Sequence, residues 1–182
     1  MKFRRISASE LTSSSYTGVE NLLKDRGGRR ECESTPTTGT FIATEPGDIL
    51  IGNIRPYLRK IWFSNRNGGT NGDVVVVRLT SEAKLFIIEK YLFYQLSSEK
   101  FFRYDNAHIK AGKMPRGDKN AIFDFEIPIP SLEAQQKVID ILDRFEALTT
   151  DLSFGLPAEI EARQQQYEYY RNKLLTFERL GA

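Results

Sequence analysis

The stretch PSLEAQQKVIDILDRFEALTT, residues 130–150, decides how the second part of the chain folds. Ser131 precedes a long helical pattern that has Glu133 in its first turn, which is typical of a helix N-terminus. Apolar residues then recur at alternating spacings of three and four, as at the a and d positions of a coiled coil. These residues are Val138, Ile141, Phe145, Leu148 and Leu152. The pattern predicts a helix with a narrow apolar seam.

A second helix is predicted after an interruption at residues 153–157. Gly155 suits the end of one helix, and Pro157 suits the start of the next. The same alternation of three and four continues through Ile160, Arg163, Tyr167, Tyr170, Leu174 and Phe177. Two consecutive helices with such narrow seams cannot cover each other across a five-residue break, so we expect a helix from elsewhere to cover them. The alternative is that both helices pack on their own domain.

The chain before Pro130 has the pattern of a mixed α/β body. Short β-rich runs are separated by turn-forming residues, and they lie at residues 41–44, 48–54, 59–64 and 73–79. The glycine-rich residues 68–73 are predicted to be a hairpin connection, and residues 122–127 a short strand before two prolines.

One long helix is predicted in this body, from about residue 84 to residue 104, because five apolar residues fall on one stripe. They are Leu85, Ile88, Leu92, Phe93 and Leu96. The fold class is therefore α+β, with a mixed domain at residues 1–130 and a coiled-coil-forming helical region at residues 131–182.

Composition excludes several classes of protein. Of the 182 residues, 40% are apolar and 12% aromatic, which is enough for a folded core. Cys32 and His108 are the only cysteine and histidine, so neither an internal disulfide nor a zinc site is expected. No apolar run approaches the roughly 20 residues of a membrane span, and the first ten residues lack the apolar segment of a signal peptide. We expect a soluble cytoplasmic protein.

No nucleotide-binding or hydrolase motif of the common types is present. Asp73, Glu82 and Lys84 loosely imitate the carboxylates and lysine of a metal-dependent nuclease, but Glu82 falls in a predicted turn. The RGD tripeptide at residues 116–118 is a chance match in a chain without an export signal. The sequence predicts no catalytic residue, no cofactor and no metal in this chain, and the alternative is a Mg²⁺ nuclease.

Basic residues gather in three segments of the body, at residues 24–30, 51–62 and 109–119. The first 130 residues carry 20 lysines and arginines against 15 acidic residues, whereas the remaining residues carry six against nine. One such cluster is ordinarily a solvated loop, but three together favour binding to a polyanion. Arginine can bind a guanine edge or a phosphate, and asparagine can bind an adenine edge. The candidate DNA contacts are Asn53, Arg55, Tyr57, Arg59, Lys60, Asn71, Lys110, Lys113, Arg116 and Lys119. Trp62, in contrast, is expected in the core.

Residues 127–177 resemble the conserved helical region of the DNA-specificity (S) subunits of type I restriction-modification systems. The resemblance rests on IPIP (127–130), on Leu-Glu-x-Gln (132–135) and on GLPAEIEARQQQYEYYRNKLL (155–175). The body is similar to one recurrent type of target-recognition domain. The similar segments are YTGVENLLKDRGG (16–28), GDILIGNIRPYLRKIWF (47–63), GGTNGDV (68–74) and KMPRGDK (113–119).

This resemblance implies a subunit that neither cleaves nor methylates DNA. S subunits read double-stranded DNA and hold methyltransferase (M) subunits, which bind S-adenosylmethionine, and restriction (R) subunits, which use ATP and Mg²⁺. Each recognition domain reads one half of a split target, and the helical region sets the distance between the halves. A usual S subunit has two recognition domains and two helical regions, whereas this chain has one of each and resembles a half-subunit.

A half-subunit implies a homodimer that pairs through the helical seam and reads inverted half-sites. The predicted interface residues are Val138, Ile141, Phe145, Leu148, Leu152, Ile160, Tyr167, Tyr170 and Leu174. The alternative is a regulatory half-subunit that binds methyltransferase subunits without target selectivity of its own.

Overall fold

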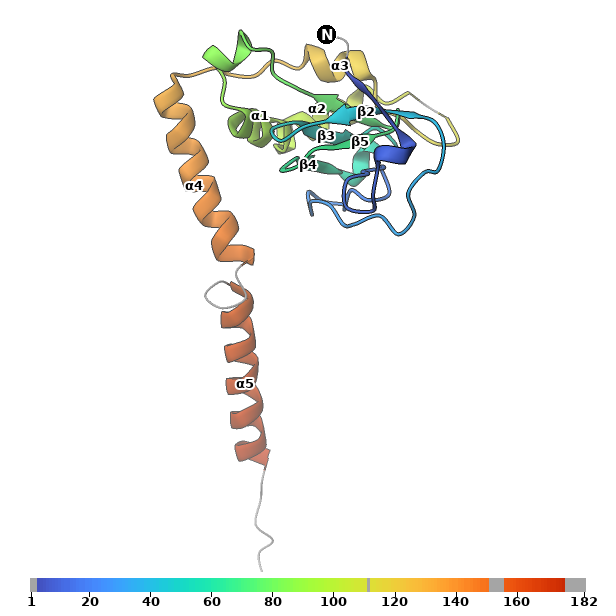
Figure 1. Cartoon of the computed structure of the whole chain (residues 1–182). Coiled ribbons are helices and arrows are strands. Elements are labelled where there is room, and N and C mark those ends of the chain that lie inside the picture. The colour runs from blue at the N-terminus through green and yellow to red at the C-terminus, as the bar shows by residue number, and fades with distance from the viewer. Residues whose placement is uncertain (1–2, 111, 151–155, 176–182) are drawn as a thin grey trace, which may run out of the picture. The chain divides into compact units, whose positions relative to one another are not determined.

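The computed structural model of the chain describes residues 3–110, 112–150 and 156–175. The chain divides into two compact units, Met1–Gln136 and Lys137–Ala182. The first unit holds all the strands and the short helices, and the second holds most of the two long helices (Figure 1). This is the predicted α+β class.

The strands are β1 (Arg5–Ser7), β2 (Thr40–Thr44), β3 (Ile49–Gly52), β4 (Ile61–Phe63), β5 (Gly68–Thr70) and β6 (Val74–Val77). Three short 3₁₀ helices lie among them: η1 (Ala8–Glu10), η2 (Pro56–Leu58) and η3 (Ala83–Leu85). The α-helices are α1 (Glu89–Leu96), α2 (Glu99–Ala107), α3 (Lys119–Asp124), α4 (Leu132–Thr150) and α5 (Leu156–Leu175).

The strands form two antiparallel three-stranded sheets, with the orders β1-β2-β5 and β4-β3-β6. The central strand β3 is buried on both faces, as its uninterrupted apolar run requires. Ile49 and Ile51 pack in the cluster that includes residues of α1, α2 and α3, while Leu50 packs in a separate cluster with Leu22 and Val74. The β4-β3-β6 sheet is therefore the centre of the first unit.

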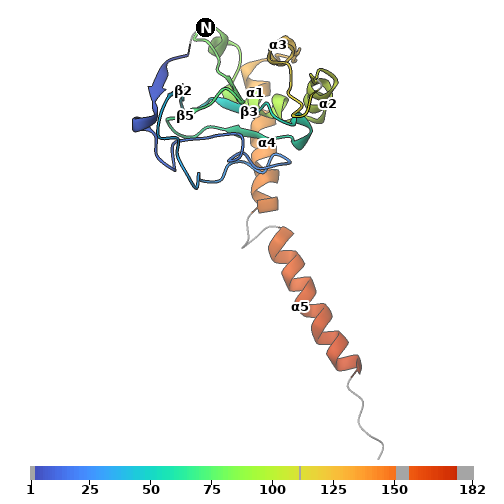
Figure 2. The ribbon, with the colours of Figure 1, turned by 90° about the vertical axis from the view of Figure 1, so that its right-hand side faces the viewer.

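Helices α1 and α2 contribute four of the nine buried residues of this core cluster. Leu92 and Leu96 come from α1, and Phe101 and Phe102 from α2. Ile122 of α3 completes the cluster. The two views in Figures 1 and 2 agree that α3 lies beside α2.

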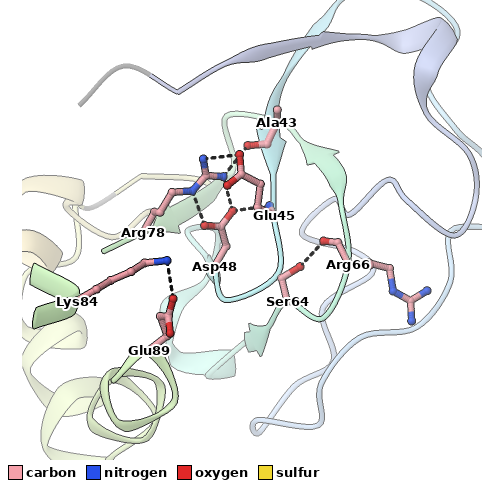
Figure 3. A network of polar contacts seen from close by, with 8 residues as sticks. All are labelled: Ala43, Glu45, Asp48, Ser64, Arg66, Arg78, Lys84 and Glu89. Carbon is pink, nitrogen blue, oxygen red and sulfur yellow. Dashed lines mark hydrogen bonds and ion pairs between the residues drawn. The ribbon is translucent and has the colours of Figure 1, made fainter. Parts of the chain in front are cut away.

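A buried ion pair ties β2 to the β4-β3-β6 sheet (Figure 3). The carboxylate of Asp48, 1% exposed, accepts two hydrogen bonds from the Arg78 guanidinium, at 2.6 and 2.7 Å. Arg78 also donates to the carbonyl of Ala43 in β2 at 3.1 Å and forms an ion pair with Glu45 at 3.0 Å. The hydrogen bond to Asp48 raises the pKa of Arg78 above its ordinary value. Both carboxylate oxygens of Asp48 are thus satisfied inside the fold.

The helix predicted from residue 84 to residue 104 is instead two helices. Ser97 and Ser98 separate α1 from α2, and the Ser98 hydroxyl caps α2 by accepting a hydrogen bond from the N–H of Phe101 at 3.2 Å. Leu85 does not belong to the buried stripe, because it ends η3 and is 68% exposed. Serine hydroxyls can bond to the local backbone in place of the helical hydrogen bonds, and here these bonds end α1 and start α2.

Two predictions for short segments are wrong. Gly68–Thr70 is not part of a hairpin connection but a buried strand that pairs with β2, so the chain crosses between the sheets there. Residues 122–127 are not a strand, because helix α3 includes Ile122 and starts at a cap on Asp118. The Asp118 carboxylate accepts a hydrogen bond from the N–H of Asn120 at 3.0 Å.

The start of α4 agrees with the predicted cap. The Ser131 hydroxyl accepts a hydrogen bond from the N–H of Ala134 at 3.3 Å. One turn later, the fully buried Gln135 donates to the carbonyls of Phe86 and Pro130, at 2.7 and 2.8 Å. The first compact unit thereby extends past Pro130 into the first turn of α4.

Helices α4 and α5 are long and carry exposed apolar side chains. The seam residues on α4 are exposed at Val138, Ile141, Phe145 and Leu148, and those on α5 at Ile160, Tyr167 and Tyr170. Helix α5 begins at Leu156 and extends past Leu174. Leu152 and residues 153–155 of the predicted interruption lie outside the described residues.

Candidate nucleic-acid interface

Three segments that are distant in sequence meet at one end of the β4-β3-β6 sheet, and we name them together the three-loop surface. They are residues 53–59, 71–73 and 110–119, and residue 111 of the last segment lies outside the described residues. The N–H of Asn53 donates to the carbonyl of Asp73 at 2.9 Å. The N–H of Arg55 donates to the carbonyl of Pro115 at 2.8 Å, and that of Gly117 donates back to Asn53 at 3.1 Å. Two of the three predicted basic segments therefore form one continuous surface.

The loop at residues 110–119 is closed on itself at its base. The backbones of Lys110 and Arg116 exchange hydrogen bonds at 2.8 and 3.4 Å. The Lys110 ammonium lies 3.0 Å from the Asp118 carboxylate, and this hydrogen bond holds the pKa of Asp118 below its ordinary value. The loop is therefore organised by its own contacts before any ligand binds.

The turn at residues 55–59 has a left-handed backbone at both ends. Arg55 and Arg59 each have a φ of 52°, on either side of the short helix η2. A neighbouring turn supports this conformation, because the N–H groups of Asp25 and Arg26 donate to the carbonyls of Leu58 and Arg59, at 2.9 and 3.0 Å. Left-handed backbone at residues other than glycine costs about 1–3 kcal/mol each, and such residues gather at binding sites. The turn holds the side chains of Arg55 and Tyr57 exposed to solvent.

The exposed cations of the three-loop surface differ in what they contact. Within the described residues, the side chains of Arg55 and Lys113 make no hydrogen bond or ion pair. Arg116 forms an ion pair with Asp73 at 2.9 Å, and Lys119 donates to the carbonyl of Gly72 at 2.7 Å. Contacts this exposed contribute little to stability, so they can be exchanged for phosphate contacts.

The remaining predicted DNA contacts take part in the fold itself. The Arg59 guanidinium pairs with Glu99 of α2 at 2.8 Å. The Lys60 ammonium donates to the carbonyl of Val19 at 2.7 Å, and burial lowers the pKa of Lys60. The Asn71 side chain donates to the Tyr16 hydroxyl at 3.2 Å. Asn53 is buried, with only 5% of its surface exposed.

The third basic segment, residues 24–30, holds the fold together through Arg29. Its guanidinium donates to the hydroxyl of Thr17 at 2.9 Å and to the carbonyls of Ser14 and Tyr16, both at 2.8 Å. It also lies over the half-buried ring of Trp62, 5.5 Å from the ring centre. Burial is the main cause that lowers the pKa of Arg29. This arginine is not available to a polyanion.

Sequence reasoning missed Asp105, which lies beneath the three-loop surface. Its carboxyl is 2% exposed, and burial raises the pKa of Asp105 to about 6. A signal for this burial was present, because Asp105 follows Phe101 by one helical turn and so falls on the buried face of α2. Gly117 was also missed as a packing residue, since its need for space depends on contacts distant in sequence.

Neither a metal site nor the imitated nuclease centre is assembled in the described part of the chain. Across residues 3–110, 112–150 and 156–175, no group of three or more His, Cys, Asp or Glu side chains could hold a metal ion. Asp73 pairs with Arg116, and Lys84 pairs with Glu89 at 2.7 Å. None of the described helices combines the length and the apolar character needed to cross a membrane.

Comparison with protein families identifies this architecture. The family model "Type I restriction modification DNA specificity domain" matches residues 35–162. The chain belongs to this family. The match begins before β2 and ends within α5, so it includes all three segments of the three-loop surface and the start of the second long helix.

Several curated proteins are similar to this specificity domain. A putative type I specificity subunit of Mycoplasma pneumoniae is 41% identical over 141 residues, which cover 76% of this chain and 41% of that protein. The specificity subunit of the type I restriction enzymes EcoR124I and EcoR124II of Escherichia coli is 40% identical over 91 residues, or 50% of this chain and 22% of that protein. A putative specificity subunit of Haemophilus influenzae is 33% identical over 131 residues, which cover 72% and 32%. The alignments thus span less than half of each of these relatives.

Solved structures share the fold of this specificity domain. The HsdS subunit of Thermoanaerobacter tengcongensis superposes with a TM-score of 0.67 at 18% identity, covering 100% of this chain and 48% of that one. A chain from a structural study of complex assembly in the type I R-M system gives a TM-score of 0.66 at 19% identity, again with 48% of that chain covered. The chain therefore corresponds in fold to about half of an HsdS subunit.

Proposed function

We propose that this specificity domain binds double-stranded DNA sequence-specifically and reads one half of a split target within a type I restriction-modification complex. The observation that carries the proposal is the three-loop surface, where Arg55 and Lys113 project without partners among the described residues. Membership in the specificity family supports DNA as the ligand. The chain acts as a non-catalytic subunit that supplies selectivity to its partners.

The surface offers two kinds of DNA contact. Arg55 stands on a rigid turn, and an arginine held in this way can bind the guanine edge with two parallel hydrogen bonds. Lys113 and the exposed side chains of Lys110, Arg116 and Lys119 are suited to phosphates, which position a protein on DNA without specifying sequence. Tyr57, also exposed, can add contact with sugar or base.

The long helices supply the surface for protein partners in this proposal. Apolar side chains such as Ile141, Leu148 and Ile160 are 53–68% exposed on the helices, which favours burial against another chain. We assign this seam to a second copy of the chain and to docking of methyltransferase subunits, through which restriction subunits join. S-adenosylmethionine, ATP and Mg²⁺ would then reside on those partners.

The experiment is a selection of bound duplexes from a random-sequence library, followed by affinity measurements with the enriched motif. Arg55→Ala is expected to weaken binding about tenfold or more and to relax preference at one base pair. Lys113→Ala should weaken binding to all sequences alike. It should also reduce the slope of log K against log salt concentration by about one.

Arg66→Ala is the matched control, because Arg66 is exposed but lies beyond the opposite end of the β3–β4 pair. Its carbonyl accepts a hydrogen bond from Ser64, whose N–H donates to Asp48 just before β3. The DNA affinity of the Arg66→Ala variant should equal that of the unaltered chain. If Arg55→Ala and Lys113→Ala also leave binding and methylation by the assembled complex unchanged, the DNA surface has been misplaced.

A second candidate function is a regulatory half-subunit that occupies methyltransferase subunits without choosing a target. The exposed helical seam favours a protein partner whether or not the body reads DNA. Co-purification with methyltransferase subunits, together with a library selection that enriches no motif, would establish this alternative over the first.

A further inference from the structure

Gly117 occupies a site in the three-loop surface where no other residue fits without displacement. It is buried, and its N–H is held by the carbonyl of Asn53. A Cβ atom at this position would lie 2.9 Å from Oδ1 of Asp105, 3.0 Å from Oδ1 of Asn53 and 3.3 Å from Cγ of Pro56. One glycine of the basic loop is thus surrounded by Asn53, which follows β3, by Pro56 of η2 and by Asp105 of α2.

The two oxygens that face Gly117 have unusual surroundings. Oδ1 of Asn53 and Oδ1 of Asp105 are both buried, and neither has a hydrogen-bond partner in the described structure. A buried acceptor without a donor is destabilising, and such groups are uncommon in folded proteins. Stability alone therefore does not explain Asp105 and Asn53. Their position under the basic loop points to a role in holding that loop.

We propose that Asn53 and Asp105 are positioning residues that form a polar seat for Gly117 and so fix the loop 110–119 against Arg55. The inference rests on the proposed DNA-binding function, and it changes the role expected for Asn53. Asn53 was expected from sequence to pair with a base. In the structure Asn53 is buried, and its amide oxygen faces Gly117 of the loop. In this proposal it affects DNA binding only through the cations that the loop carries.

The seat explains how the loop and the arginine turn are held in one geometry. The backbone bonds from Arg55 to Pro115 and from Gly117 to Asn53 require the two segments to approach closely. A Cβ atom at position 117 would force either the two buried side chains or the loop itself to shift, and glycine avoids that displacement. Displacing Gly117 therefore moves Lys113 and Arg116 away from Arg55 and separates the phosphate contacts from the reading side chain.

The seat is tested with Asn53→Ala and Gly117→Ala in the full chain, singly and together. Gly112→Ala is the matched control in the same loop, because no atom lies within 4 Å of a Cβ built there. Hydrogen exchange of residues 53–57 and 110–118 measures loop release without DNA. Both variants should accelerate exchange of the Arg55 and Gly117 amides about tenfold, while the control exchanges like the unaltered chain.

DNA binding is measured with a fluorescent duplex carrying the motif enriched by the library selection, and with duplexes changed at each base pair. We expect Asn53→Ala and Gly117→Ala each to raise Kd about tenfold, with the loss spread over all base pairs. The double variant should lose no more than the weaker-binding single variant, because both changes disrupt one unit.

Two results would overturn the seat. One is an Asn53→Ala variant whose loop exchanges normally and whose preference changes at a single base pair, as a base-reading residue requires. The other is a Gly117→Ala variant with unchanged exchange and unchanged Kd. If Gly117→Ala does not fold, Asn53→Ala decides alone, since it introduces no clash. If the unaltered chain selects no motif, the DNA function fails, and hydrogen exchange still decides the seat.

Discussion

Arginine side chains either hold the fold together or remain available to a ligand in this protein, and the difference is whether the guanidinium is buried or exposed. Arg29 and Arg78 have their guanidinium groups within the fold, where they satisfy carbonyls and carboxylates that would otherwise be buried without donors. Arg55 has the same chemistry, but its turn holds it exposed and without partners among the described residues. The same side chain is thus structural in one place and available to a ligand in another.

Removal of Arg78 is expected to destabilise the first unit strongly. Arg78→Ala leaves the Asp48 carboxylate buried without its charge partner, which costs about 3–5 kcal/mol of unfolding free energy. Urea unfolding followed by circular dichroism measures the loss. Arg103→Ala is the control, because its exposed pair with Glu99 should contribute about 0.5 kcal/mol or less. Equal losses in the two variants would contradict this account of Asp48.

Asp105→Asn should stabilise the protein at neutral pH and not at acid pH. Burial raises the pKa of Asp105 from 3.8 to about 6, so the folded state binds this proton more tightly than the unfolded state. The stabilisation from that proton is complete below about pH 4 and is lost as pH rises through about 6. Above pH 6 the unaltered chain therefore carries a cost of up to roughly 3 kcal/mol that asparagine removes.

Thermal unfolding across this pH range measures the difference between Asp105→Asn and the unaltered chain. The difference in Tm should grow from about pH 4 to about pH 7.5. Asp124→Asn, at an exposed position on α3, should show no such growth. A pH-independent difference at position 105 would mean that the carboxyl is not desolvated in the folded protein.

At the scale of elements, periodicity predicted where helices occur better than where they end. The stripe through Leu92 and Leu96 is buried as expected, but Ser97 and Ser98 divide the helix because their hydroxyls bond to nearby backbone groups. The alternation in residues 122–127 suggested a strand, yet the Asp118 cap and the burial of Ile122 favour a short helix. Local hydrogen bonding and tertiary burial decided both cases against the pattern.

The helical seam gives a prediction about self-association. Ile141→Asp places a charge in the proposed dimer interface, so we expect it to convert dimers to monomers in sedimentation velocity. Ala147→Asp adds the same charge to the same helix at an exposed position outside the a and d spacing, and it should remain dimeric. Dimers that persist in Ile141→Asp would exclude the seam of α4 from the interface.

At the scale of the whole molecule, the chain covers 48% of the length of each of the two solved chains compared above. Two copies related by a twofold axis would carry two identical recognition surfaces. Twofold symmetry in a protein is mirrored in the DNA site that it binds. The proposed dimer therefore implies a target made of two identical, inverted half-sites.

This implication is measured by mapping modified bases genome-wide in cells where this chain is the only specificity component. We expect one palindromic motif split by a fixed, unread spacer. A control strain with Arg55→Ala should lose or broaden the motif, while Arg66→Ala keeps it. A split motif with two different halves would show that the chain does not act as a symmetric pair.

The sequence by itself determined the α+β class and the presence of the long helices, because these depend on local periodicity. It indicated the family through a resemblance carried by motifs such as IPIP (127–130) and GLPAEIEARQQQYEYYRNKLL (155–175). It also located the basic segments at residues 51–62 and 109–119. Only the tertiary structure decided that these two segments form one surface, that Arg29 is structural and that Asn53 is buried. The physical reason is that exposure and partner choice depend on contacts between residues far apart in the chain. Gly117, enclosed by Asn53, Pro56 and Asp105, has no local pattern that could have revealed its role.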